Sequence, residues 1–238
     1  MILAGLVAGG TGTRMKQNMP KQFLTVGGET ILARTLRVFL GSGQTDGILI
    51  GVPEAWKDYT EELVSGVLRD TKSTKRVVVC TGGSSRNETL MRLLAAAESE
   101  FGASDDDIFL THDAVRPFVT DAMITANVTA METAKAATTA IPSTDTILLS
   151  MDGSTVDSVP KRAMAYQAQT PQTARFSVFR RILSELPEGE RESVTDLCGL
   201  CERKGIKAVL VPGSAENIKI TGPLDLPLAE AILAQRGR

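Results

Sequence analysis

The chain has 238 residues, 42% of them hydrophobic and 23% charged, and its net charge is −2. This length suits a single domain, 1–238, that buries enough surface to fold without disulfides. The near-neutral charge and the aromatic content of 4% argue against nucleic-acid and membrane surfaces, so any site for a polyanion must be local. Three irregularly spaced cysteines form no disulfide framework, and the apolar start is too short for a signal peptide; we expect a cytoplasmic protein.

Apolar runs and helix-like patterns alternate along the first 134 residues. The apolar runs predict strands at 3–7, 47–52, 76–80 and 108–111. The helical patterns predict helices at 30–40, 56–68, from about 85 onward, and at about 120–134. This alternation predicts an α/β fold with a doubly wound, mostly parallel, Rossmann-like sheet.

The alternation stops between residues 140 and 173. Two short runs, 145–149 and 155–159, flank Asp152-Gly153 and predict a hairpin. Such an excursion is typical of a dimer arm, so we expect a protruding β-arm at about 141–172. Helices are then predicted near 174–186 and 194–204, a strand at 207–211, and a final helix from Pro223 to near residue 235.

A glycine-rich loop, LVAGGTGTRM at 6–15, follows the first strand and is closed by Pro20-Lys21. Successive backbone N–H groups in such a turn can hold phosphate oxygens, and Arg14 and Lys21 add positive charge. A Walker loop would need Gly-Lys-Ser/Thr, and a dinucleotide fingerprint a third glycine at Met15. The loop therefore indicates a different class of nucleotide-binding site.

Two further motifs follow strands. The segment 82–89, GGSSRNET, contains a helix cap at Ser84 or Ser85 with Glu88 placed for a capping box. The segment 112–117, HDAVRP, lies at a strand's carboxyl end, where open α/β sheets bind ligands. Asp113 there suits Mg²⁺, which prefers one or two carboxylates plus phosphates. His112, the only histidine, is more easily explained as structural.

The remaining motifs are weaker when each is taken alone. They are three in number: Pro142 to Thr146; Arg162 followed by Thr170-Pro171-Gln172; and Thr195-Asp196 together with Glu216 to Thr221. Lys219 lies in a strand-like run between Ile218 and Ile220, where a solvated lysine is the plain interpretation. Cys198 and Cys201 lie in a predicted helix and lack the further ligands of a zinc site, so burial explains them best.

Together these six motifs, which span nearly the whole chain, resemble the nucleotidyltransferases of the glycosyltransferase-A type. They are most similar to the cytidylyltransferases that act on methylerythritol phosphate or ribitol phosphate. The resemblance implies a CTP site made by Ala8, Gly9, Gly10, Thr11, Gly12, Gly83, Ser84, Arg86, Thr89 and Asp113. It also implies Mg²⁺ on Asp113, and Arg14, Lys21 and Lys219 around the reacting phosphates.

The same resemblance implies that a polyol phosphate binds to Arg116, Thr146, Arg162, Thr170 and Thr195, and that the arm crosses to the second subunit of a homodimer. The acceptor phosphate is already ionised, so its oxygen would attack the α-phosphorus of CTP without a protein nucleophile. Catalysis would then be positioning and charge neutralisation.

Local features favour ribitol 5-phosphate as the acceptor. They are Val115 before Arg116, the glutamine-rich 166–169, and Asp196 followed by Leu197 where the other branch has a second acid. Methylerythritol 4-phosphate is the alternative. A UTP- or dTTP-dependent sugar-phosphate nucleotidyltransferase would lack the arm and the 217–219 segment. A non-catalytic CTP-binding module would not retain Arg14, Lys21, Asp113 and Lys219.

Overall fold

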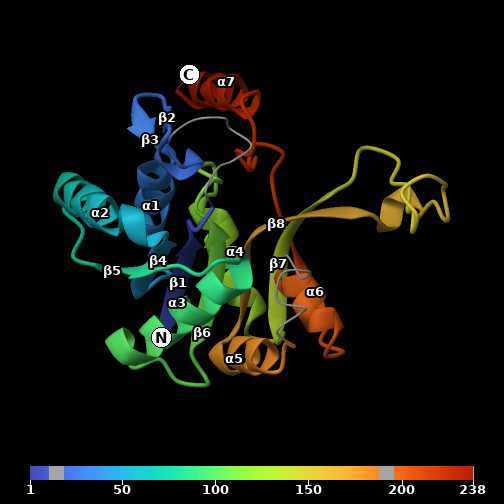
Figure 1. Ribbon diagram of the computed structural model, residues 1–238, viewed down its shortest axis with the longest axis horizontal. Helices are drawn as coiled ribbons and strands as arrows, with labels where there is room; N and C mark the ends of the chain where they lie inside the picture. The colour runs from blue at the N-terminus through green and yellow to red at the C-terminus, as the bar shows by residue number, and fades with distance from the viewer. Residues whose placement is uncertain (11–18, 188–195, 238) are drawn as a thin grey trace.

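The computed structural model describes residues 1–10, 19–187 and 196–237, and shows an α/β body from which an arm extends to one side (Figure 1). The strands are β1 (Ile2–Val7), β2 (Thr25–Val26), β3 (Glu29–Thr30), β4 (Gly47–Val52), β5 (Arg76–Thr81), β6 (Ile108–Asp113), β7 (Ala136–Pro142), β8 (Tyr166–Arg175) and β9 (Ala208–Pro212). The α-helices are α1 (Ile31–Gly41), α2 (Lys57–Thr71), α3 (Arg86–Phe101), α4 (Asp121–Ala130), α5 (Phe176–Ser184), α6 (Leu197–Glu202) and α7 (Asp225–Arg236).

The central sheet has the strand order β5-β4-β1-β6-β8-β7-β9. Strands β5, β4, β1 and β6 pair in parallel, and so do β7 and β9. Strand β8 is antiparallel to both of its neighbours, β6 and β7. The predicted α/β class and mostly parallel sheet are confirmed. A short hairpin, β2–β3, lies apart from this sheet and was not predicted.

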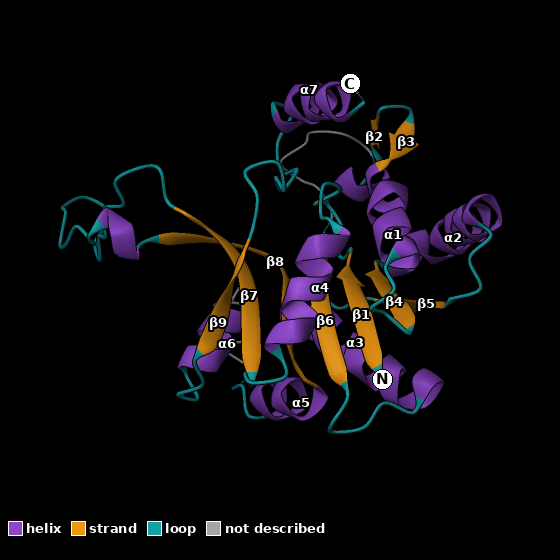
Figure 2. Cartoon of the chain, turned by 180° about the vertical axis from the view of Figure 1, so that it is seen from behind, coloured by secondary structure: helices purple, strands orange, loops and turns teal. Residues whose placement is uncertain are grey.

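Helices cover both faces of the sheet because apolar side chains on its inner strands alternate between two cores (Figure 2). Ile48 and Ile50 of β4 pack in one cluster with residues of α1, α2 and α4. Leu49, between them, packs in the other cluster with residues of α3, α5 and α6. Strand β4 is buried along its whole length, as a central parallel strand is expected to be. None of the helices within the described residues combines the length and apolar character that crossing a membrane requires.

The protruding arm is the segment 143–165, which connects the outer ends of β7 and β8 (Figure 1). The predicted hairpin of 145–149 and 155–159 is wrong in detail, since only an isolated bridge between Leu149 and Ser158 forms there. The Asp152 carboxylate accepts hydrogen bonds from the N–H groups of Ser154 and Thr155, both at 2.8 Å, and so holds the tip as a side-chain-closed turn.

Two other predicted helix boundaries change, and one predicted strand-like run forms no strand. Helix α4 ends at Ala130, since the chain enters β7 at Ala136. Helix α5 starts at Phe176, because β8 continues to Arg175. Lys219 lies on an irregular extended segment outside the named strands. That segment is held against the loop after β6 by Ile220, whose N–H donates to the Val115 carbonyl at 2.9 Å.

Candidate active site

The first cavity, of about 360 Å³, lies at the carboxyl ends of β1 and β6 and beside the loop after β5. This is the sheet edge at which open α/β folds place their ligands. Backbone hydrogen bonds join the strand ends at this edge: the Ala8 N–H donates to the Gly51 carbonyl, the Gly82 N–H to the Val52 carbonyl and the Ala114 N–H to the Val7 carbonyl. The described residues that line it are Val7, Ala8, Gly9, Gly10, Lys21, Gln22, Gly83, Ser84, Ser85, Arg86, Thr89, Asp113, Val115 and Lys219.

Thr89 forms the back of this cavity. Its hydroxyl accepts from the Gly83 N–H at 3.0 Å and donates to the Ser85 carbonyl at 2.9 Å. A Cβ at Gly9 would lie 3.0 Å from the same hydroxyl oxygen, and a Cβ at Gly83 only 2.3 Å from Glu88 Cγ. Side chains at both glycines would crowd the wall, so the glycines are required by close packing around the cavity.

The predicted helix cap at the start of α3 is Ser85, and the Glu88 side chain closes the turn on Ser84, the residue before the cap. The Ser85 hydroxyl accepts from the Glu88 N–H at 3.1 Å. Glu88 Oε2 in turn accepts from the hydroxyl and the N–H of Ser84, both at 2.7 Å. These two bonds, with a smaller contribution from Arg92, lower the pKa of Glu88 to about 2. The turn therefore fixes Ser84 at the rim of the first cavity.

Gln22 is a site residue that sequence reasoning missed. Its buried side chain donates from Nε2 to the Ala8 carbonyl at 2.6 Å, which ties the segment η2 (Lys21–Phe23) to the glycine loop. This bond holds the neighbouring Lys21 at the cavity wall. The only signal in the sequence was its place directly after Lys21 in the loop-closing motif.

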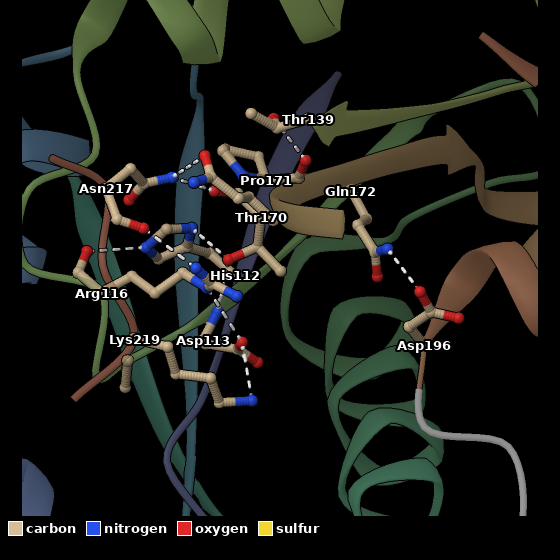
Figure 3. A network of polar contacts seen from close by, with 12 residues as sticks. His112, Asp113, Arg116, Thr139, Thr170, Pro171, Gln172, Asp196, Asn217 and Lys219 are labelled. Carbon is tan, nitrogen blue, oxygen red and sulfur yellow. Dashed lines mark hydrogen bonds and ion pairs between the residues drawn. The ribbon is translucent and has the colours of Figure 1, made fainter. Parts of the chain in front are cut away.

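Asp113 stands at the centre of a cluster of cations (Figure 3). Its Oδ2 lies 3.0 Å from Lys219 Nζ and 3.3 Å from Arg116 Nε, and its Oδ1 lies 3.7 Å from Arg86 Nε. Burial raises the pKa of the Asp113 carboxyl, but Lys219, Arg86 and Arg116 outweigh burial and hold it well below its usual range. Asp113 is thus ionised and surrounded by excess positive charge.

Behind Asp113, His112 takes part in a buried hydrogen-bond chain (Figure 3). A carbonyl can only accept, so His112 Nε2–H donates to the Arg116 carbonyl at 3.1 Å. His112 Nδ1 then accepts from the Thr170 hydroxyl at 2.9 Å, and that hydroxyl accepts from the Asp113 N–H at 3.1 Å. Burial lowers the pKa of His112 to about 4. His112 is a neutral positioning residue for Asp113 and Arg116.

A second cavity, of about 220 Å³, opens beside the first. Its described lining residues are Arg86, Asp113, Arg116, Ala168, Gln169, Thr170, Gln172, Asp196 and Lys219. Arg86, Asp113 and Lys219 belong to both cavities. Arg86 Nη1 is buried and has no hydrogen-bond partner within the described residues, so an anionic ligand oxygen would satisfy it. Two ligands could therefore meet at one cationic cluster.

The structure unites most of the predicted site residues. Ala8, Gly9, Gly10, Lys21, Gly83, Ser84, Arg86, Thr89, Asp113 and Lys219 line the first cavity, and Arg116 and Thr170 line the second. Thr146 and Arg162 are exposed on the arm and are not among the described residues that line either cavity. Thr11, Gly12, Arg14 and Thr195 lie outside the described residues.

The described residues include no group of three or more His, Cys, Asp or Glu side chains that could hold a metal ion unaided. Among the described residues that line the first cavity, Asp113 is the one with an acidic side chain. Its Oδ1 lies 3.7 Å from Arg86 Nε, beyond hydrogen-bond distance, whereas its Oδ2 is paired with Lys219 and Arg116. One carboxylate oxygen is what Mg²⁺ needs when a nucleotide's phosphates supply further ligands.

Cys201 lies away from this site. It is buried, and burial raises the pKa of its thiol to about 12.

Residues 2–235 match the model of the IspD family, described as 2-C-methyl-D-erythritol 4-phosphate cytidylyltransferase. The chain belongs to this cytidylyltransferase family. It is 38% identical to the ribitol-5-phosphate cytidylyltransferase of Lactiplantibacillus plantarum, over 99% of this chain and 100% of that protein. This membership confirms the predicted enzyme class, a nucleotidyltransferase, and leaves both predicted acceptors within one family.

Solved structures agree with the family. The chain resembles the 4-diphosphocytidyl-2C-methyl-D-erythritol synthase of Anaerococcus prevotii with a TM-score of 0.79 and 28% identity, covering 98% of this chain and 96% of that one. It resembles the 2-C-methyl-D-erythritol 4-phosphate cytidylyltransferase of Thermus thermophilus with a TM-score of 0.72 and 30% identity, covering 99% and 100% of the two chains. The fold of these cytidylyltransferases therefore extends over the whole chain.

Proposed function

We propose that this enzyme transfers CMP from CTP to D-ribitol 5-phosphate, giving CDP-ribitol and pyrophosphate in the cytoplasm. The observation that carries this proposal is the junction of two cavities at Arg86, Asp113 and Lys219. The reaction joins two anions, so its chief obstacle is their repulsion. Cations at the point where the two ligands meet reduce that repulsion in the ground state and in the transition state.

In this proposal CTP occupies the first cavity. The backbone around Gly9, Gly10 and Gly83 approaches the nucleotide closely, and Lys21 faces its phosphates. The acceptor's phosphate oxygen attacks the α-phosphorus and forms a new P–O bond. The bond to the bridging oxygen of the β-phosphate breaks, and pyrophosphate leaves with that electron pair. Lys219 and Arg86 hold the two reacting phosphates in contact.

Asp113 would hold Mg²⁺ together with phosphate oxygens of the nucleotide. When bound, the ion supplies neutralisation of negative charge on the phosphates. Asp113 also fixes Lys219 and Arg116 through its ion pairs, which orients the cations before the substrates arrive.

Ribitol 5-phosphate is favoured over methylerythritol 4-phosphate by the 38% identity to a ribitol-5-phosphate enzyme over the full length. The glutamine-rich approach to Thr170 supports the same acceptor, and its last residue, Gln169, lines the second cavity. Methylerythritol 4-phosphate is the alternative, because the matching family model carries that substrate in its description.

The proposed enzyme acts as a homodimer through the arm. Large apolar side chains are exposed along it, including Leu148, Met151, Val159 and Met164, of which Met151 is 95% exposed. Such a patch on a protruding segment favours burial against another protein surface. Thr146 and Arg162 lie on the same arm, so a second copy could bring them to an acceptor.

The testing experiment is pyrophosphate release from CTP and Mg²⁺ with each acceptor in parallel. Release with ribitol 5-phosphate but not with methylerythritol 4-phosphate is the expected result. The reverse pattern would retain the reaction and overturn the acceptor. No release with either acceptor would overturn the proposed function.

A further inference from the structure

The second cavity has two chemically different ends (Figure 3). Arg86, Arg116 and Lys219 surround Asp113 at one end. Gln172 and Asp196 form the other, and Figure 3 draws Asp196 across the view from Asp113 and Lys219. One small cavity thus offers excess positive charge at one side and an acceptor-only carboxylate at the other.

Gln172 is fixed by the protein and leaves little hydrogen-bonding capacity for a ligand. Its side chain is buried, its Oε1 accepts from the Leu197 N–H at 3.1 Å, and its Nε2 donates to the Thr138 hydroxyl at 3.1 Å. The same Nε2 lies 3.4 Å from Asp196 Oδ2. Gln172 is therefore a positioning residue that holds Asp196 at the cavity wall.

Among the contacts that the described residues make, the two carboxylate oxygens of Asp196 differ. Oδ1 accepts from the Gly199 N–H at 2.9 Å, which caps α6. Within the described part of the chain, Oδ2 receives only the long contact from Gln172. The side chain is partly buried, so water satisfies this oxygen only in part. Oδ2 can thus accept a hydrogen bond from a hydroxyl group in the cavity.

The charge distribution also fixes the direction of a bound acceptor. The Asp196 carboxylate repels a phosphate, whereas the cations beside Asp113 attract one. A polyol phosphate has a dianionic end and a chain of hydroxyl donors, which match these two ends in only one orientation. We propose that Asp196 binds a hydroxyl of the acceptor polyol and thereby selects polyol phosphates that place a hydroxyl within its reach.

This inference rests on the proposed function and adds a specificity-determining residue to it. A site built to hydrogen-bond a hydroxyl discriminates against an acceptor that lacks or misplaces it, because the carboxylate then loses water without gaining a partner. Asp196 acts only on the acceptor in this proposal. CTP binding in the first cavity, which Asp196 does not line among the described residues, is expected to be independent of it.

The decisive variant is Asp196→Asn, which removes the charge but retains a good helix cap. We expect KM for the acceptor that the wild type uses to rise roughly tenfold, the difference between a charged and a neutral hydrogen-bond acceptor. kcat and KM for CTP should change less than about twofold. Asp121→Asn, at an exposed first position of α4, is the matched control and should change none of these values.

Asp196→Ser, which keeps a cap and lacks a carboxylate, is the second variant and should raise the acceptor KM at least as much. Circular dichroism confirms that each variant is folded. A folded variant with wild-type acceptor KM would overturn the inference and leave the proposed function standing. A wild-type enzyme that turns over neither acceptor would overturn both.

Discussion

Lys219 lies where the two cavities join, 3.0 Å from Asp113, and its side chain is 41% exposed. A flexible ammonium in this place can follow charge as it develops between the two phosphates. We expect Lys219→Met to lower kcat by on the order of 10²-fold, as loss of a transition-state charge donor does. Lys207→Met, at an exposed lysine that is not among the residues lining these cavities, is the control. Near-normal turnover in pyrophosphate release by Lys219→Met would contradict the assignment.

His112 makes stability depend on pH. Its pKa is about 4 in the folded chain, against an ordinary 6.5, because it is buried. Between these values the unfolded chain binds a proton that the folded chain does not, so stability is fully present above pH 6.5 and falls as the pH drops toward 4. The full shift corresponds to roughly 3 kcal/mol.

His112→Gln tests this dependence. Its free energy of unfolding should change less between pH 7 and pH 5 than that of the wild type, although the variant is less stable at pH 7. Asp113 adds nothing in this window, since its pKa is lowered from an already acidic value. Urea titrations at several pH values measure the slope. An equal slope in the two proteins would show that another group is responsible.

Asp113 was predictable from its place at the carboxyl end of a strand, whereas Arg86 and Lys219 were expected only from the family resemblance. Polar residues that act through distant partners were not predictable. Asn217 donates to the Thr170 carbonyl at 2.9 Å across 47 positions of the chain, and its carbonyl accepts from Arg116 at 2.9 Å. No local pattern contains those contacts, so the support of Arg116 became visible only in the fold.

Helix α3 links stability to nucleotide binding through its first turn. Ser85→Ala removes the cap of the Glu88 N–H and should destabilise the protein by about 1 kcal/mol. Because the same turn holds Ser84 at the first cavity, KM for CTP should rise as well.

Thr120→Ala is the matched control at the start of α4, where the Thr120 hydroxyl accepts from the Met123 N–H at 3.3 Å. It should lower the free energy of unfolding by a similar amount and leave KM for CTP unchanged. Thermal melts with steady-state kinetics measure both effects. Equal KM values for CTP in the two variants would show that the cap of α3 does not contribute to nucleotide binding.

Strand β8 shows why one central element escaped prediction. It is buried from Gln169 to Ala174, yet much of that stretch is polar: Gln169, Thr170, Gln172 and Thr173. A periodic pattern of apolar residues predicts strands that pack against a hydrophobic core, whereas these side chains form hydrogen bonds with other polar groups. Thr173 Oγ1, for example, donates to Asn127 Oδ1 at 3.3 Å. The polar strand serves the second cavity, which explains why its composition departs from the apolar pattern.

At the scale of the whole molecule, the α/β rhythm predicted the sheet well because β1, β4, β5 and β6 are adjacent parallel strands joined by helices. It also predicted the site's location, since parallel strands bring their carboxyl ends to one edge. The assembly of two chains through the arm stays a prediction. It has a direct test in the exposed Met151 and Val159.

The double variant Met151→Asp with Val159→Asp should convert a dimer to a monomer in analytical ultracentrifugation, because each charge would have to be buried at the interface. If the arm completes the partner's site, this monomer should also lose activity. Wild-type chains that sediment as monomers would contradict the dimer itself.

Mixed dimers decide whether the arm acts on its own chain or on its partner. Arg162→Ala inactivates only the arm, and Lys219→Met only the cavity. Suppose that each arm acts on the partner chain. A dimer of the two variants then has one intact site, which combines the native Lys219 of one chain with the native Arg162 of the other. Random reassociation makes about half of the dimers mixed, so about a quarter of wild-type activity should appear from two nearly inactive proteins. If each arm serves its own chain, every site in the mixture carries one defect and mixing restores nothing.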